Sequence, residues 1–101
     1  MTSNNLKQYQ LFINGKWTDA STGKTFRTAD PYTGEDWAEL AEGDATDVEA
    51  AIDAARAAFD NSWWRREPRK RAKVMQRLAD LLLQNVENLG PIESRDNGKL
   101  L

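Results

Sequence analysis

Two residue types are missing from this 101-residue sequence, and each absence removes a kind of chemistry. There is no cysteine, so disulfides, thiolate metal sites and a cysteine nucleophile are excluded. There is no histidine, so the chain lacks the commonest general base near neutral pH and any Ser–His–Asp or Cys–His arrangement. The usual forms of nucleophilic catalysis are therefore excluded within these residues.

Glycine, proline and long apolar runs are also scarce. Six glycines and three prolines are too few for a disordered or collagenous chain. No apolar run approaches the roughly 18 residues that a membrane span needs, so we expect no membrane partner. The first ten residues lack a basic region followed by an apolar core, and we therefore expect a cytoplasmic location. Length and composition predict one ordinary globular domain or a part of one.

The formal net charge of −2 conceals a strong asymmetry along the chain. Residues 30–60 contain ten acidic side chains and one basic one, a balance of −9. Residues 65–77 contain seven basic side chains and one acidic one, a balance of +6. We expect these blocks to lie near each other or near other charges, because isolated like charges repel.

Residues 10–28 are predicted to form a β-hairpin followed by a third short strand. The turn is Asn14-Gly15, and both central residues of a type I′ turn need a positive φ. The third strand, at 25–28, is rich in β-branched and aromatic residues. We expect residues 1–9, which precede this pattern, to be a flexible N-terminus.

A further strand is predicted over 36–41, after a turn at Asp30-Pro31-Tyr32-Thr33-Gly34. In that strand, Trp37 is opposed in phase to Ala38 and Leu40. Simple alternation therefore places the tryptophan on the other face of the sheet.

Three helices follow the strands in the prediction. The first covers 45–60, begins at an Asp44 cap and carries an apolar stripe that includes Ile52. The second covers 68–84 and opens with a proline, and its wide apolar face is typical of a helix packed on a sheet. The third covers 86–97, with Asn85 as a cap, Pro91 as a kink or restart, and a glycine stop.

The familiar catalytic, nucleotide-binding and metal-binding motifs are not found in this sequence. GxGxxG, GxxxxGK[ST], HExxH and CxxC motifs are all absent. The carboxylates cluster on a turn and a helix start, which favours capping and solubility over paired acid–base catalysis. The basic block at 65–77 lies beside Trp63 and Trp64, and basic groups next to aromatic rings can bind the phosphates and bases of a nucleic acid. The overall acidity of the chain favours a solvated helix face instead.

Several short motifs, in order, resemble the opening of the aldehyde dehydrogenase superfamily. Residues 12–17 read FINGKW and residues 30–35 read DPYTGE, similar to the family's FINGxW and NPxTGE. The remaining matches are AEGDA at 41–45, DVEAA at 47–51, AARAAF at 54–59, Trp63 or Trp64 with Arg71, LADL at 78–81 and ESRDNGK at 93–99. The resemblance covers about residues 11–99 and departs from the family at Gly90-Pro91 and at Arg95, which replaces a usually apolar residue.

The resemblance implies an α/β parent fold with a Rossmann-like coenzyme domain, of which residues 10–101 form the N-terminal part. It implies oxidation of an aldehyde to an acid with NAD or NADP, through a cysteine, an oxyanion site and a water-activating glutamate. Those groups and the dinucleotide site lie later in the family's chain, so we expect no catalytic and no cofactor-binding residue here. The implied partners are the remainder of the enzyme, an aldehyde and further subunits in a dimer or tetramer, without nucleic acid.

One ligand site is implied within these residues. Many family members bind Na⁺ or K⁺ through backbone oxygens after the third strand and through the aspartate of DNGK. The matching positions are Thr28, Ala29 and Asp96. Oxygen ligands of this kind suit hard cations. The alternative is that Asp96 only caps or pairs near the end of its helix.

A second hypothesis of another class stays open at this point. The chain could be a stand-alone interaction module that binds a partner protein or an anionic ligand through the basic helix at 65–77. A reading frame that continues past codon 101 would favour the enzyme, and a genuine stop codon would favour the module.

Overall fold

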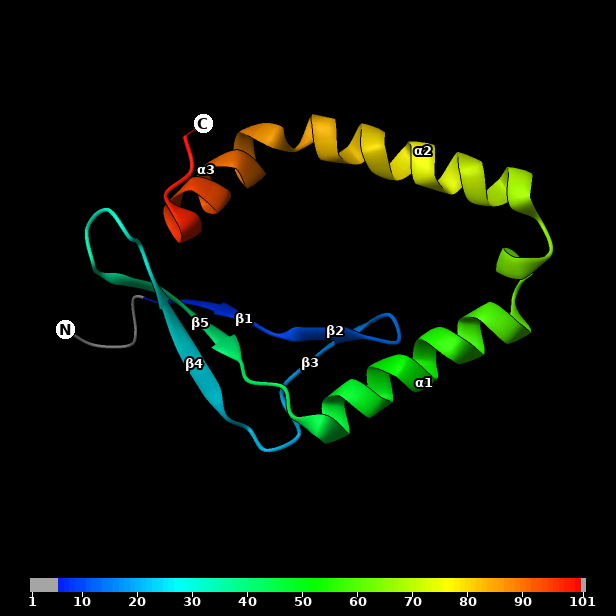
Figure 1. Cartoon of the computed structure of the whole chain (residues 1–101), viewed down its shortest axis with the longest axis horizontal. Helices are drawn as coiled ribbons and strands as arrows, with labels where there is room; N and C mark the ends of the chain where they lie inside the picture. The colour runs from blue at the N-terminus through cyan, green and yellow to red at the C-terminus, as the bar shows by residue number, and fades with distance from the viewer. Residues whose placement is uncertain (1–5, 101) are drawn as a thin grey trace.

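A computed structural model describes residues 6–100 as strands followed by helices, which confirms the predicted order (Figure 1). The strands are β1 (Lys7–Tyr9), β2 (Leu11–Ile13), β3 (Lys16–Thr18), β4 (Thr25–Ala29) and β5 (Asp36–Ala41). The helices are α1 (Ala45–Asn61), the short 3-10 helix η2 (Trp63–Arg65), α2 (Pro68–Gln84) and α3 (Val86–Asn97).

The strands form two small sheets. β2 and β3 make the predicted hairpin, and Asn14 and Gly15 both have positive φ, at 54° and 75°. The hairpin is shorter than expected, because the third strand, β4, does not extend it. β4 pairs antiparallel with β5 in a three-stranded sheet of order β1-β5-β4.

The prediction of a flexible segment through residue 9 is wrong for Lys7–Tyr9, which form β1. This strand pairs parallel with β5, with Lys7 opposite Ala38 and Tyr9 opposite Leu40. The partner lies about thirty residues away in the sequence, so no local pattern in residues 1–9 could reveal it. Of the rest of that prediction, Leu6 forms a bend before β1, and residues 1–5 lie outside the described residues.

The helix ends follow local capping rules at two of the predicted places. Asp44 caps α1 by accepting from the backbone N–H groups of Thr46 and Asp47, and the Asp47 side chain accepts from the Asp44 N–H in return. This reciprocal capping box satisfies donors that a helix start leaves free. At the other end of the chain, Gly98 has φ 77° and closes α3 through a bond to the Ser94 carbonyl.

The predicted cap at Asn85 needs correction, and of the two alternatives for Pro91, a kink or a restart, the restart is wrong. The Asn85 side chain does not cap α3 but donates back to the Leu81 carbonyl, 2.8 Å away, and so ends α2. The helix does not restart at Pro91 but runs through it. Because α3 begins at Val86, the proline lies in the second turn, where it removes the single bond to the Glu87 carbonyl.

The chain is much more open than a compact domain of its size. Its radius of gyration is 17.0 Å, whereas a compact chain of about 100 residues has about 13 Å. Within residues 6–100 the buried hydrophobic residues are Ala20 and Ala38. Figure 1 shows α1 and α2 as opposite sides of a ring joined by η2, with the sheets and α3 closing it.

Candidate functional site

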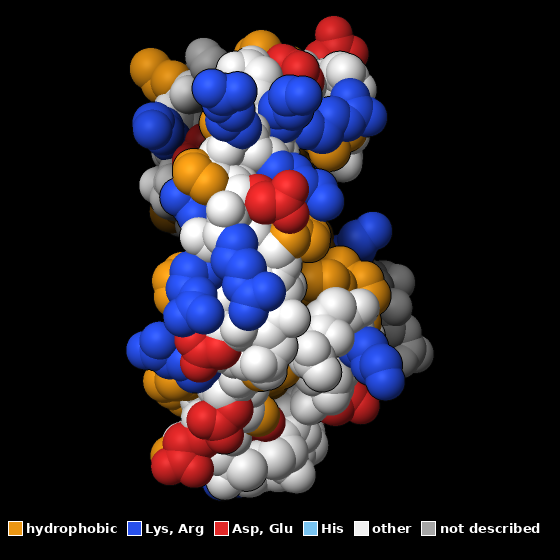
Figure 2. Space-filling view, turned by 90° about the vertical axis from the view of Figure 1, so that its right-hand side faces the viewer, with side chains coloured by type: hydrophobic (Ala, Val, Ile, Leu, Met, Phe, Trp, Pro, Cys, Tyr) orange, Lys and Arg blue, Asp and Glu red, His pale blue; other side chains and the backbone are white. Residues whose placement is uncertain are grey.

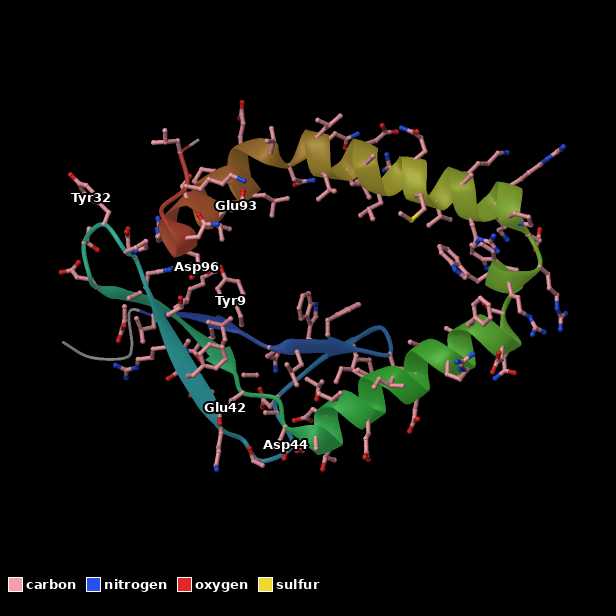
Figure 3. The ribbon with its side chains drawn as sticks, in the orientation of Figure 1. Tyr9, Tyr32, Glu42, Asp44, Glu93 and Asp96 are labelled. Carbon is pink, nitrogen blue, oxygen red and sulfur yellow. The ribbon has the colours of Figure 1, made fainter. Side chains whose placement is uncertain are left out.

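The candidate cation residues lie where α3 meets the three-stranded sheet. Thr28 and Ala29 end β4, and Asp96 lies in the last turn of α3. The Thr28 hydroxyl donates to the Asp96 carboxylate, with Oγ1 2.5 Å from Oδ1. Figure 3 shows Asp96 on the side of α3 that faces the strands. The fold therefore brings together residues that are 68 positions apart.

A β-bulge occurs at the same place. Thr28 pairs with Ala38, but the next residue, Ala29, pairs with Asp36, so β5 has one extra residue, Trp37. Such a bulge interrupts the ladder and changes the direction in which a side chain points. The bulge is therefore adjacent to the two β4 positions of the candidate site.

The bulge also corrects the prediction for the tryptophan. Trp37 does not lie on the opposite face from Leu40. Both line one groove of about 300 Å³ between the sheet and α3. The Trp37 ring makes a T-shaped contact with the Tyr9 ring, at a centroid distance of 6.1 Å and an interplanar angle of 76°. Alternation holds only in a regular strand, and the extra residue breaks it.

The groove has apolar walls and a small number of polar groups. It is lined by Tyr9, Thr28, Trp37, Leu40, Leu89, Ile92, Glu93 and Asp96. The carboxylates are Glu93 and Asp96, which Figure 3 shows on α3 near the strands. No group of three or more His, Cys, Asp or Glu side chains within residues 6–100 could hold a metal. A cation here would need backbone oxygens beside the Asp96 carboxylate, which is the donor set that hard monovalent ions accept.

Arg95 was conspicuous in the sequence only as a departure from the family pattern. In the structure its guanidinium carbon lies 5.3 Å from the centroid of the Trp37 ring. This is within the range of a cation–π contact. The arginine is exposed and the tryptophan half-buried, so α3 and β5 are joined by a contact that sequence reasoning missed.

A second cluster that the sequence only partly revealed surrounds Asp47. This carboxylate is 9% exposed, the one buried charged side chain within residues 6–100. It accepts from the backbone N–H of Asp44 at 3.1 Å and from the backbone N–H and hydroxyl of Ser21. The N–H of Asp44, more than the bonds from Ser21, holds the pKa of the Asp47 carboxyl below its usual range. The cluster ties the loop after the hairpin to the start of α1.

The basic block does not pair with the acidic block. Within residues 6–100 the ion pairs join Arg27 to Asp36, at 3.8 Å, and to Glu39, at 4.0 Å. Lys70 instead lies 4.4 Å from the centroid of the Trp63 ring, and Arg71 donates to the Trp64 carbonyl at 2.7 Å. Figure 2 shows Lys and Arg side chains exposed over much of the face at the η2 end of the molecule. The block is thus a solvated helix face that also packs on aromatic rings.

A model of the aldehyde dehydrogenase family matches residues 17–101. The chain belongs to the aldehyde dehydrogenase family. It is 48% identical over 96 residues to aldehyde dehydrogenase family 2 member C4 of Arabidopsis thaliana, covering 94% of this chain and 19% of that protein. It is 46% identical to the human mitochondrial aldehyde dehydrogenase, covering 89% of this chain and 18% of that protein.

Solved structures give the same assignment. The NAD⁺ complex of an aldehyde dehydrogenase from Bacillus cereus matches with a TM-score of 0.85 and 37% identity, over 90% of this chain and 19% of that one. The chain therefore has the fold of the corresponding part of a Rossmann-like aldehyde dehydrogenase, and it spans about a fifth of the length of its relatives. These matches give no support to a stand-alone interaction module.

Proposed function

We propose that this chain is the N-terminal part of the coenzyme-binding domain of an enzyme that oxidises an aldehyde to a carboxylic acid with NAD or NADP. The observation that carries the proposal is family membership over most of the chain, combined with a span of 19% of a relative's length. In this proposal the segment has a structural role. The nucleophile, the oxyanion site and the dinucleotide site belong to later segments.

The surface of the chain supports this role. It exposes 8273 Å², whereas a compact protein of 11.4 kDa exposes about 5,800 Å². Many large apolar side chains are exposed, and on α1 and α2 they include Val48, Ile52, Phe59, Val74, Met75, Leu78, Leu81, Leu82 and Leu83. Apolar area on this scale is typical of a surface that another part of the same protein covers.

The dinucleotide would supply the hydride acceptor when it is bound to the whole enzyme. The residues described here do not fit a dinucleotide site, because no glycine-rich loop joins a strand to a helix start at Asp44, Glu67 or Asn85. Residues 6–100 therefore take no part in hydride transfer in this proposal.

A monovalent cation site at Thr28, Ala29 and Asp96 is part of the proposal. The bond between Thr28 and Asp96, and the bulge next to it, support the site. A further ligand would come from a later segment of the enzyme. The cation would join α3, β4 and that segment, and so stabilise the coenzyme domain.

The oligomeric state and the cellular location are two further parts of the proposal, and each has less support. A dimer or tetramer rests on family membership alone. For location, no helix within residues 6–100 is long and apolar enough to cross a membrane. The cytoplasm remains the proposed compartment, although the name of the human relative places that protein in mitochondria.

The coding sequence past codon 101 tests the main proposal. We expect an open frame that continues into a glycine-rich strand–helix segment and a lone cysteine that serves as the nucleophile. The intact product should form NADH or NADPH from an aldehyde, and the 101-residue chain should not. A stop codon directly after Leu101, or an intact product without such a cysteine, would overturn the proposal.

A further inference from the structure

We propose that Trp37 and Arg95 are positioning residues for the cation site: together they clamp α3 onto β5 and thereby hold Asp96 against the end of β4. The inference rests on the proposed cation site and deepens it. It concerns two side chains outside the proposed ligand set of Thr28, Ala29 and Asp96.

The position of the tryptophan is the first step. Trp37 is the extra residue of the bulge, so it is adjacent in space to the Thr28–Ala29 end of β4. Its ring is supported from the sheet side by the T-shaped contact with Tyr9. The ring is thus a fixed platform on the groove side of the sheet, presented to α3.

The indole N–H has no role of its own among the described residues. Trp37 Nε1 is buried and has no hydrogen-bond partner within residues 6–100. The contacts that hold this tryptophan within residues 6–100 are therefore those of its ring, with Tyr9 and Arg95. Its aromatic face is the feature in use, which predicts that phenylalanine can replace it.

Arg95 supplies the other half of the clamp. Its guanidinium lies over the Trp37 ring at 5.3 Å, and it directly precedes Asp96 in the helix. Apart from this contact, α3 is joined to the sheet near its C-terminal end by the bond between Thr28 and Asp96. The contacts of Arg95 with β5 and of Asp96 with β4 come from consecutive residues. Together they fix the distance of the last turn of α3 from the sheet and its rotation about the helix axis. The carboxylate is thereby directed toward the bulge.

A matched pair at the other end of the molecule provides the control. Lys70 lies over the Trp63 ring at 4.4 Å, which is the same kind of contact at a place far from the cation site along the chain. Loss of this pair should affect stability without affecting the cation.

The test uses the intact protein encoded by the gene and measures melting temperature against KCl or NaCl concentration, with choline chloride at equal ionic strength as the reference. A cation that binds only the folded state raises the melting temperature with a midpoint set by its affinity. We expect Arg95→Met, which keeps an apolar stem, and Trp37→Leu to raise that midpoint about two- to fivefold. Arg95→Lys and Trp37→Phe should stay close to the wild-type midpoint, and Lys70→Met should leave it unchanged.

Two results would overturn the clamp. If Arg95→Met and Trp37→Leu melt earlier with an unchanged cation midpoint, the pair is merely structural and the cation site stands. If the wild-type protein shows no cation-specific stabilisation, both the cation site and the clamp are wrong. The proposal of aldehyde oxidation is then unaffected, because the activity assay tests it separately. Should Trp37→Leu fail to fold, Arg95→Met against Arg95→Lys still decides the question.

Discussion

Helices α2 and α3 follow each other directly, yet they meet their surroundings in different ways. α3 lies against the strands of its own chain, through Thr28–Asp96 and Trp37–Arg95. The main neighbours of α2 are η2 and α3, and its Leu78 is 48% exposed. Although α3 also exposes Val86 and Leu89, it has contacts with strands of the segment, whereas α2 has an apolar face with no strand among its main neighbours.

This difference shows what kind of object the segment is. The sheet, the hairpin and α3 are held by turns, by caps and by contacts between distant residues that the chain itself supplies. Helices α1 and α2 have caps and apolar stripes, but no hydrophobic core within residues 6–100 lies beneath them. These two 17-residue helices should gain most of their stability when another surface buries those stripes, because helices in proteins are stabilised mainly by packing of an apolar face.

The largest expected effect is on the uncovered face. Leu78→Ala should lower the free energy of unfolding of the intact protein by about 2–5 kcal/mol, because the side chain is buried there. In the 101-residue chain alone the same change should leave the helix content almost unchanged, since Leu78 is already 48% exposed there. Denaturant unfolding measures the loss in the intact protein, and circular dichroism measures the helix content of the isolated chain. No loss of stability in the intact protein, or a clear loss of helix content in the isolated chain, would contradict the contrast between α2 and α3.

A glycine comparison sharpens the account of the α3 end. Gly98 has φ 77°, and a Cβ there would lie 3.1 Å from Pro31 Cγ. Gly15 has φ 75° and open space around it, so it is the matched control. In the intact protein we expect Gly98→Ala to cost about 2 kcal/mol and Gly15→Ala about 1 kcal/mol, because only the first adds a clash to the strain of positive φ. The opposite order in denaturant unfolding would show that the turn at Pro31 does not restrain α3.

The smallest expected effect is at the start of α1 and depends on pH. The folded state holds the pKa of the Asp47 carboxyl below its usual value of 3.8, so the carboxylate stabilises the fold above that pH. The contribution is lost as the pH falls through the lowered folded pKa. In the intact protein, Asp47→Asn should reduce the protection of backbone amides from hydrogen exchange in the first turn of α1 at pH 6. It should also make that protection depend less on pH as the pH is lowered.

Glu49→Gln provides the control for that measurement. Glu49 is exposed on the same helix and is not among the contacts of Asp47. We expect it to leave both protection and its pH dependence unchanged. If the two variants behave alike, general loss of negative charge on α1 would explain the effect, and the bonds to Ser21 and Asp44 would not.

Local rules predicted the parts of this fold that are local. Asn14-Gly15 specified the turn through positive φ, Asp44 specified the start of α1, and Pro68 specified the start of α2. In each case the deciding atoms lie within about four residues of one another. The resemblance to the family added the meeting of Thr28 with Asp96, which no periodicity could give.

The errors concern contacts between distant residues, except the one at Asn85, whose partner is four residues away. β1 exists because β5 pairs with it, and Trp37 changes face because the pairing of β4 with β5 skips a residue. Asn85 looked like a cap for the following helix, but its amide is used by the preceding one. The contact of Arg95 with Trp37 joins residues on α3 and β5, so the sequence showed only an odd substitution.

Calorimetric unfolding of the 101-residue chain by itself tests the central claim most directly. If α1 and α2 await a partner surface, the chain should unfold gradually on heating, without a cooperative heat-absorption peak. A self-sufficient domain of this length would show a sharp transition with an enthalpy of about 70 kcal/mol. Such a transition from the monomeric chain would contradict the claim that this segment is built to be covered by the rest of an aldehyde dehydrogenase.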